Sequence, residues 1–288
     1  MGSLTVIKPG LLSLLQDRGR PGLAFYAIPR SGPLDPQSAE LASALLGNKP
    51  DAPTIECHFV PPTLQFETAA TICLTGADMH WQVGGRPVER HETLTIPAGS
   101  QLSGAPAQDN CRAYIAIRGL IQTDQTFGSA ACYALGGFGG NGGKPFAPGD
   151  TLAWQEPEGP TFPLRLDVES TKPTSEELHL LPGPEFDWLT KQSQMALQTE
   201  TFTITADSDR MGARLHGPPL TTASQALAES VPLLPGFVQL PPSGQLIVVL
   251  QDGQTTGGYP RIGFLCAATL CQFNQIPLGQ GFGFQVGA

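Results

Sequence analysis

Short runs in which apolar and polar residues alternate recur along the chain. In residues 201–206 (TFTITA), the apolar side chains fall on one face of an extended strand and the threonines on the other, as in a half-buried β-strand. Turn-forming glycines and prolines separate such runs. The other predicted strands are 71–74, 93–96, 112–117, 178–181, 237–240, 246–250 and 282–286. This pattern predicts a mainly β protein.

Helix signals are few. Asp35 is a good N-cap residue, Pro36 suits the first helical position, and residues 37–46 continue the pattern until Gly47 ends it. A weaker helix is predicted over 185–194. Many short strands with few short helices indicate a barrel or sandwich rather than a parallel α/β sheet.

A segment rich in Pro, Glu, Thr and Ser, residues 156–177, has the composition of a linker. It predicts two β-rich lobes. We expect an N-terminal lobe over 1–160, a linker over 161–177 and a C-terminal lobe over 178–288.

The composition narrows the function classes. A formal net charge of −9 argues against nucleic acid or an anionic membrane as the partner. No run approaches the roughly 18 apolar residues of a membrane-spanning helix, and the first apolar run is too short for a signal peptide. The six cysteines form no C-x-x-C pair. We therefore expect a cytoplasmic protein with reduced thiols.

Residues 252–260 (DGQTTGGYP) stand out because nine residues without an aliphatic side chain follow the apolar run 246–250. Polar groups beside a buried strand are costly unless they find partners. The segment therefore either folds back as a turn or presents its groups to a ligand. Asp252 and Gly253 form a good turn dipeptide, but this interpretation leaves four residues unexplained: Gln254, Thr255, Thr256 and Tyr259.

Arginines concentrate beside predicted strand ends. Five of the eleven arginines lie in three polar clusters. These five are Arg18, Arg20, Arg210, Arg214 and Arg261. Two of the clusters also contain an aspartate, Asp17 or Asp209. Guanidinium groups suit the capture of a carboxylate or phosphate. The alternative is that each Asp–Arg pair is a local salt bridge that fixes a loop. For one cluster alone we favour the salt bridge, and for the three together we favour a ligand site.

Other motifs point away from common enzyme classes. Gly137, Gly139 and Gly142 match G-x-G-x-x-G, but Pro145 and Pro148 follow, so no helix can begin where phosphates would need one. We expect a flexible loop over a cleft there. The five histidines lack zinc-type spacing, which predicts no metal site. Cys57 and His58 are adjacent on a strand and would point to opposite faces. A serine nucleophile elbow is also absent.

Six motifs in fixed order resemble one known family. They are Gln16-Asp17-x-Gly19-Arg20, Ser31-Gly32-Pro33-Leu34-Asp35, Gly128-Ser129, Asp209-Arg210-Met211-Gly212-x-Arg214-Leu215, Pro235-Gly236-x-Val238-Gln239-x-Pro241, and the run 252–262. Together they resemble the allophanate hydrolase subunit 2 family, also called the biotin-dependent carboxyltransferase A/B domain. The resemblance covers nearly the whole chain and implies a cyclophilin-like β-barrel architecture.

The bacterial members of this family include the third subunit of a three-component 5-oxoprolinase. The resemblance implies a subunit of an ATP-dependent complex that opens 5-oxo-L-proline, a small amide, to L-glutamate. It implies a subunit-1 family partner and a further subunit, with ATP bound on or with these partners. One alternative is the carboxyltransferase subunit of a biotin-dependent urea carboxylase, whose biotin is carried elsewhere because this chain has no attachment site. Another is a regulatory subunit that antagonises a kinase inhibitor.

The predicted site follows from the resemblance and the polar clusters. Asp252 or Asp209 would act as general base or orient water, and hydrogen-bond donors would stabilise charge on the amide oxygen. The predicted catalytic residues are Asp252, Asp209, Thr255 and Tyr259. The predicted substrate-binding residues are Arg20, Asp17, Arg210, Arg214, Gln254, Thr256, Gly257 and Gly258. The chain departs from the family pattern at Ala130, Ala131, Lys144 and Thr269, which leaves the substrate open.

Overall fold

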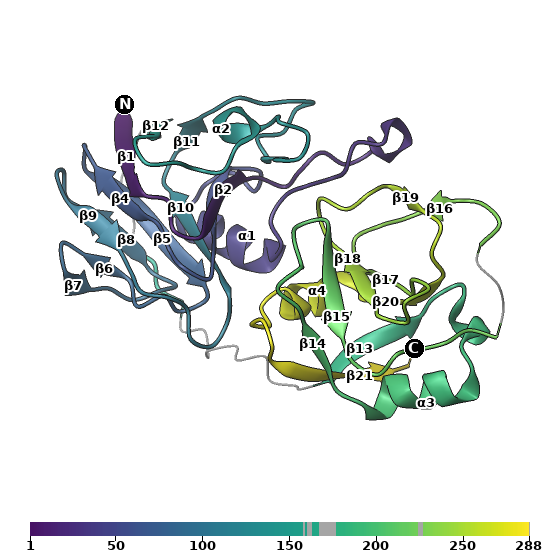
Figure 1. Ribbon diagram of the computed structural model, residues 1–288. Helices are drawn as coiled ribbons and strands as arrows, with labels where there is room; N and C mark the ends of the chain where they lie inside the picture. Colours follow the sequence, from purple (N-terminus) through teal and green to yellow (C-terminus); the bar gives the residue numbers. More distant parts are fainter. Residues whose placement is uncertain (158, 160–162, 167–176, 224–226, 288) are drawn as a thin grey trace. The chain divides into compact units, whose positions relative to one another are not determined.

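The structure, a computed structural model, describes residues 1–157, 159, 163–166, 177–223 and 227–287 (Figure 1). It divides into two compact units. Unit 1 comprises Met1–Arg20 and Ser31–Lys172, and unit 2 comprises Pro21–Arg30 and Pro173–Ala288. The predicted N-terminal lobe, 1–160, differs from unit 1 because residues 21–30 group with unit 2. No local pattern in the sequence indicates this exchange.

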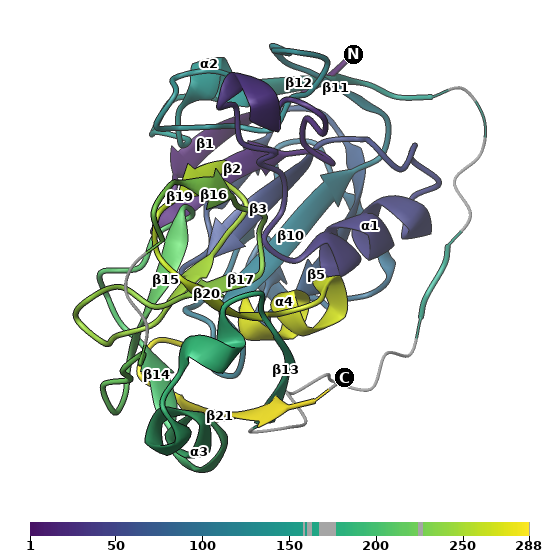
Figure 2. The ribbon, with the colours of Figure 1, turned by 90° about the vertical axis from the view of Figure 1, so that its right-hand side faces the viewer.

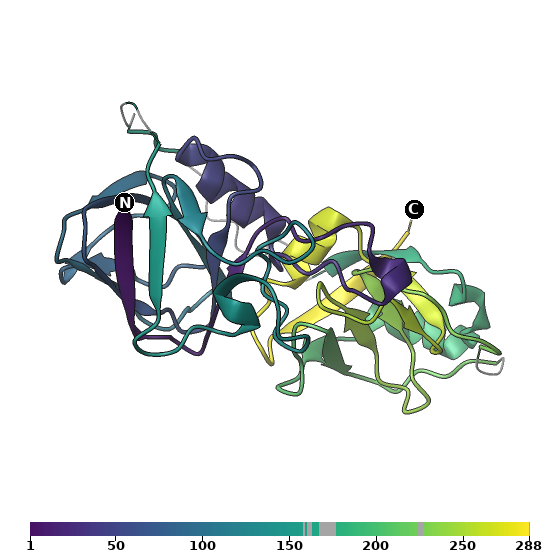
Figure 3. The ribbon, with the colours of Figure 1, turned by 90° about the horizontal axis from the view of Figure 1, so that it is seen from above.

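Within its described residues, unit 1 contains two β-sheets. The seven-stranded sheet has the order β11 (Leu120–Gln122), β12 (Thr151–Gln155), β1 (Gly2–Lys8), β4 (Thr63–Phe66), β9 (Gln101–Ser103), β6 (Gln82–Val83) and β7 (Arg86–Pro87). The five-stranded sheet has the order β2 (Leu12–Gln16), β3 (Thr54–His58), β10 (Arg112–Ile117), β5 (Ala70–Gly76) and β8 (Thr93–Ile96). Strands β1 and β12 pair antiparallel, as Figure 3 shows.

One hydrophobic core lies between the two sheets of unit 1. Leu4, Phe66 and Trp154 reach it from the seven-stranded sheet. Ile72 and Ile115 reach it from the five-stranded sheet. Because alternate strand residues point to opposite faces, the next positions along the five-stranded sheet need a cover of their own.

Helix α1 (Pro36–Leu45) supplies this cover and confirms the predicted helix. The Asp35 side chain caps it by accepting hydrogen bonds from the Ser38 backbone N–H at 3.2 Å and from the Ser38 hydroxyl at 2.6 Å. The helix lies against β10 and β5 (Figure 2). Its Ala42 packs with Cys73 and Ala116, so the five-stranded sheet is buried on both faces.

Unit 2 is built around a closed seven-stranded barrel within its described residues. The strand order is β13 (Glu177–Pro182), β20 (Arg261–Phe264), β17 (Phe237–Gln239), β18 (Ile247–Val249), β15 (Gly212–His216), β14 (Phe202–Ile204) and β21 (Gly281–Val286). The parallel pair β13–β21 closes it. Phe282 and Phe284, whose ring centroids are 5.4 Å apart, are buried. The predicted mainly β barrel architecture is confirmed.

The other elements of unit 2 are short. They are η1 (Ala24–Tyr26), η2 (Phe186–Trp188), α3 (Lys191–Thr199), α4 (Ala267–Phe273), and the two-residue strands β16 (Val231–Pro232) and β19 (Thr256–Gly257). The predicted helix 185–194 is wrong in its bounds. Thr190 caps a helix that begins only at Lys191, because its hydroxyl accepts from the Ser193 N–H at 3.2 Å. Helix α3 lies alongside β21 (Figure 1). No helix within the described residues is long and apolar enough to cross a membrane.

Two further predictions concern unit 1. Of the predicted linker, residues 161–162 and 167–176 lie outside the described residues, whereas 163–166 pair with 91–93: the Thr93 N–H donates to the Leu164 carbonyl at 2.9 Å.

In the glycine tract, where no helix was expected, α2 (Gly140–Gly143) forms one turn. Asn141 and Gly142 have φ of 55° and 62°, so this turn lies in the left-handed region that glycine tolerates.

Candidate functional site

The polar run 252–260, which we call the signature run, follows barrel strand β18 and forms part of a small ribbon. The Gly253 N–H donates to the Leu250 carbonyl at 3.0 Å, so Asp252 and Gly253 do make a turn. The Leu233 N–H then donates to the Thr255 carbonyl at 2.9 Å, and strand β19 pairs with β16. We call residues 231–233 and 252–260 together the β16–β19 ribbon. The run is therefore both a turn and a displayed surface.

The side chains of the run divide by exposure. Gln254, Thr256 and Tyr259 are exposed, Thr255 is half-buried, and Asp252 is buried. Gly257 is half-buried and Gly258 exposed. The ribbon therefore presents one amide and several hydroxyl groups to solvent, while its acid turns inward.

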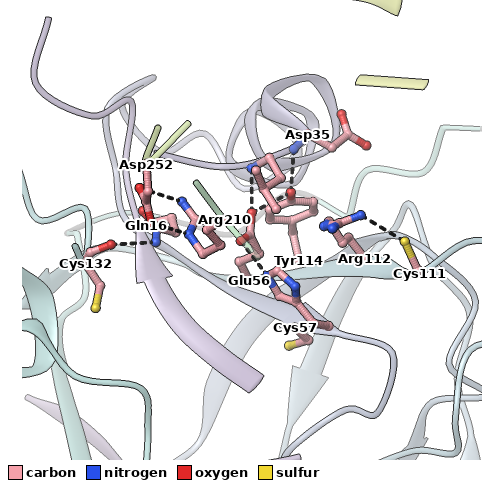
Figure 4. Close-up of polar contacts among 12 residues, drawn as sticks. Gln16, Asp35, Glu56, Cys57, Cys111, Arg112, Tyr114, Cys132, Arg210 and Asp252 are labelled. Atoms are coloured by element: carbon pink, nitrogen blue, oxygen red, sulfur yellow. Dashed lines mark hydrogen bonds and ion pairs between the residues drawn. The ribbon is translucent and has the colours of Figure 1, made fainter. Parts of the chain in front are cut away.

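Asp252 turns inward to meet Arg210 in a bidentate ion pair. The Arg210 Nε donates to Asp252 Oδ2 at 2.8 Å, and a second guanidinium nitrogen donates to Oδ1 at 3.3 Å (Figure 4). The two side chains are only 9% and 6% exposed. The Asp252 backbone N–H also donates to the Arg210 carbonyl at 3.0 Å. The pair thus ties the start of the signature run to the turn before β15.

Asp209 and Arg214 flank that turn and are both exposed. Asp209 Oδ1 accepts hydrogen bonds from the backbone N–H groups of Met211 at 2.8 Å and Gly212 at 3.0 Å. Asp209 therefore fixes its own loop through hydrogen bonds to the backbone, whereas the alternative proposed from the sequence was an Asp–Arg salt bridge. Arg214 lies on β15 and presents its guanidinium toward solvent.

A second bidentate ion pair, between Arg261 and Glu185, lies next to the ribbon and is linked to it through Pro232. The guanidinium bonds the carboxylate at 3.0 and 2.9 Å, and a third nitrogen donates to the Pro232 carbonyl of β16 at 3.2 Å. Burial raises the pKa of Glu185, but the hydrogen bonds from Arg261 outweigh it and hold that pKa below its ordinary value. Glu185 was missed from the sequence, where 76 residues separate it from Arg261.

In unit 1, Asp17 organises the segment that carries the Gly128-Ser129 motif. It accepts from the Ser129 hydroxyl at 2.5 Å, the Ala130 N–H at 2.6 Å and the Gly19 N–H at 2.8 Å. The Ala131 N–H donates to the Ser129 hydroxyl at 3.0 Å. Because 130 and 131 contribute backbone groups, the alanines at these positions keep these contacts.

Arg20 acts on the same segment. It is 2% exposed, and its guanidinium donates to the backbone carbonyls of Thr126, at 3.3 Å, and Ala131. It also stacks on Phe138, 4.9 Å from the ring centroid. Asp17 and Arg20 together therefore hold residues 126–132 in place.

A buried network in unit 1 was not predicted. Glu56 is fully buried and accepts from the Leu34 N–H at 2.7 Å and the Tyr114 hydroxyl at 2.8 Å, with His58 Nε2 at 2.8 Å (Figure 4). Burial and the Glu56 charge raise the pKa of Tyr114 well above its ordinary value. The available signal was Glu56 and His58 two apart on a strand, hence on one face.

Thr269, one of the positions at which a departure from the family pattern was expected from the sequence, contacts Cys266. The thiol sulfur lies 3.3 Å from the Thr269 hydroxyl oxygen, and this hydrogen bond holds the pKa of the exposed Cys266 below its ordinary value. Among the described residues, no three His, Cys, Asp or Glu side chains group as metal ligands would.

Residues 26–286 match the family described as "Carboxyltransferase domain, subdomain A and B". The chain belongs to this carboxyltransferase family. Its relatives include a 5-oxoprolinase subunit of Escherichia coli K12, which is 34% identical over 283 residues, 98% of this chain and 90% of the relative. The resemblance drawn from the motifs is thereby confirmed.

Solved carboxyltransferase-family structures share the fold. The crystal structure of TTHA0988 matches 99% of this chain with a TM-score of 0.87 and 30% identity, and the chain spans 55% of it. The K. lactis urea amidolyase matches 98% of this chain with a TM-score of 0.89 and 25% identity. The chain spans only 18% of that much longer protein.

The predicted site residues of this carboxyltransferase-family chain thus occupy two environments. Asp17 and Arg20 lie in unit 1, and the remaining ten lie in unit 2. Within unit 2 the structure brings Asp252 and Arg210 together and places the donors of the signature run on one ribbon. The predicted catalytic and binding roles remain predictions.

Proposed function

We propose that the chain is a subunit of an ATP-dependent 5-oxoprolinase that opens 5-oxo-L-proline to L-glutamate. The similarity to the E. coli 5-oxoprolinase subunit supports this, because it spans 98% of this chain and 90% of the relative. The observation that carries the proposal is the β16–β19 ribbon, which displays Gln254, Thr256 and Tyr259 beside a buried anchoring ion pair.

The exposed donors suit the chemistry of a lactam. When the ring amide is attacked or activated, negative charge develops on its oxygen. Hydrogen bonds from Thr255, Thr256, Gln254 or the Tyr259 hydroxyl stabilise that charge if they are already in place. The pairing of β16 with β19 fixes where such donors lie relative to one another.

Some charged groups are exposed and suit direct contact with the substrate, whereas others are buried and anchor the surrounding structure. Arg214 is exposed and suits the substrate carboxylate or a phosphorylated intermediate. Asp209 is also exposed and suits a general base or water-orienting role. Arg210 engages both oxygens of Asp252, so for this pair we favour an anchoring role over the direct catalytic and binding roles predicted from the sequence.

Asp17 and Arg20 are likewise proposed to act through the segment they hold. Both are buried, and their hydrogen bonds go to residues 126–132 and to Gly19. They would position that segment rather than contact substrate.

We further propose that the chain acts with a subunit-1 family protein and a third subunit, and that ATP binds on or with these partners. The E. coli relative is named as one subunit of its enzyme, which supports the need for other subunits. A cytoplasmic location fits the six free cysteines.

The test is release of glutamate from 5-oxo-L-proline by the complete set of co-purified subunits, with and without ATP. ATP-dependent release that falls at least tenfold in Asp209→Asn and Arg214→Met is the expected result. The matched control is Arg165→Met, since the Arg165 side chain is 64% exposed and pairs with Glu92 outside the predicted clusters. No turnover from a folded, fully assembled complex would refute the proposal.

A second candidate is a carboxyltransferase subunit acting on urea or a related amide. The TM-score of 0.89 to the K. lactis urea amidolyase favours it. This reaction needs a biotinylated carrier, so avidin would inhibit it. Activity that persists in avidin excludes this candidate and leaves the first in place.

A further inference from the structure

Gln239, the last residue of barrel strand β17, carries an amide nitrogen without a partner. The residue is 1% exposed, and its Nε2 makes no hydrogen bond to the residues that the structure describes. A buried donor that loses its bonds to water without replacing them destabilises the fold, so such groups are rare. Gln239 belongs to the Pro235–Pro241 motif, to which the proposed reaction assigns no role.

The unpartnered nitrogen faces the signature run. A β-carbon built on Gly257 would lie 2.9 Å from Gln239 Nε2 and 2.7 Å from Leu233 Cδ1. Both distances are below 3.0 Å, so a side chain at position 257 would require the flexible ends of Leu233 and Gln239 to move. Gly257 of the ribbon therefore lies beside the nitrogen and covers it.

Few hydrogen bonds hold this cover. Strands β16 and β19 are two residues long, and their own pairing is supported by one bond from the Leu233 N–H to the Thr255 carbonyl and one from Arg261 to the Pro232 carbonyl. Short elements with few buried contacts open at the lowest free-energy cost. A displacement of the ribbon by the width of one ligand atom would place that atom within reach of Nε2.

We propose that Gln239 donates a hydrogen bond from Nε2 to the carbonyl oxygen of a small planar amide, a lactam or urea, bound under the β16–β19 ribbon. An oxygen acceptor on the ligand would supply the hydrogen bond that Gln239 Nε2 lacks in the folded chain. The class of ligand rests on the proposed function, whereas the unpartnered donor and its cover do not. Gln239 is then a substrate-binding residue beside the exposed donors of the same ribbon.

The experiment uses Gln239→Met, which keeps an unbranched side chain of similar length and removes the donor. In the free chain we expect an unchanged or higher Tm, because a buried unpartnered donor is lost. In the assembled complex we expect a kcat/KM for 5-oxo-L-proline about tenfold lower, mainly through KM, as for the loss of one substrate hydrogen bond. Gln239→Leu is the second variant if the first does not fold.

The matched control is Gln245→Met. Gln245 accepts from the Gly217 N–H at 3.2 Å and donates to the Gly217 carbonyl at 3.1 Å. Its loss should lower Tm and leave kcat/KM unchanged. A Gln239→Met variant that behaves like this control overturns the proposal, because its amide would then serve the fold alone.

A ligand-binding arm separates this proposal from the proposed function. If the wild-type complex does not turn over 5-oxo-L-proline, the Tm shift produced by 5-oxo-L-proline and, separately, by urea is measured. A shift in wild type that Gln239→Met abolishes supports the role of Gln239 and rejects the hydrolase reaction. No shift with either ligand, or an equal shift in the variant, overturns the role of Gln239.

Discussion

Removing the negative charge of Asp252 should destabilise unit 2 through the partner it leaves behind. Asp252→Asn keeps the shape of the side chain but leaves the Arg210 guanidinium, 9% exposed, without its carboxylate. Breaking one partner of a buried ion pair costs about 3–5 kcal/mol. Because domains are stable by only about 5–15 kcal/mol, this is a large part of the total.

Urea unfolding of the whole chain measures the effect, with an unchanged slope as evidence that the unfolding transition is the same. The double variant Arg210→Met/Asp252→Asn removes both charges, so its cost should be well below the sum of the single variants. The control Glu40→Gln breaks the Arg18–Glu40 pair, whose side chains are 51% and 49% exposed. An exposed pair contributes about 0–1 kcal/mol.

Two results would refute this reasoning. One is an Asp252→Asn cost no larger than that of Glu40→Gln. The other is a double variant whose cost equals the sum of the single variants. Either would mean that Arg210 and Asp252 do not depend on each other, and the anchoring role would be lost.

Three further outcomes are expected. Thr269→Val should slow alkylation of Cys266 at neutral pH, because the lowered thiol pKa depends first on that hydroxyl, and mass spectrometry of the labelled peptides measures the rate. Tyr114 has a raised pKa in the folded chain, so the stability it contributes is complete below about pH 10 and is lost as pH rises further. Tyr114→Phe should therefore flatten the loss of stability above pH 10 in alkaline denaturation series, and an unchanged slope would contradict this. Gly257→Ala should displace the side chains of Leu233 and Gln239, since its β-carbon would lie 2.7 Å from Leu233 Cδ1 and 2.9 Å from Gln239 Nε2, and should accelerate amide hydrogen exchange at 255–257.

Features set by neighbouring residues could be predicted from the sequence. Asp35 and Pro36 begin α1 because capping and a fixed φ act within one turn. Within the predicted run 201–206, Phe202–Ile204 forms β14 because alternation places one side of a strand in the core. The motif order also identified the family, since it spans nearly the whole chain.

Features set by distant pairs could not be predicted. Tyr114 and Glu56 meet only because β10 pairs with β3 in a register that places them opposite each other. The hydrogen-bond partners of Arg20 were not predicted, because the carbonyls that accept its hydrogen bonds lie more than a hundred residues away along the chain. Pairwise contacts at such separation leave no local periodicity.

The grouping of residues 21–30 with unit 2 makes the chain change units at 20–21, 30–31 and 172–173. Unit 2 therefore cannot be complete on a ribosome until its second segment, 173–288, has emerged, and its first ten residues must wait for that segment. A polypeptide cut at 172–173 would divide unit 2 between two fragments. Gene fusion and recombination should therefore keep the coding regions of both units together.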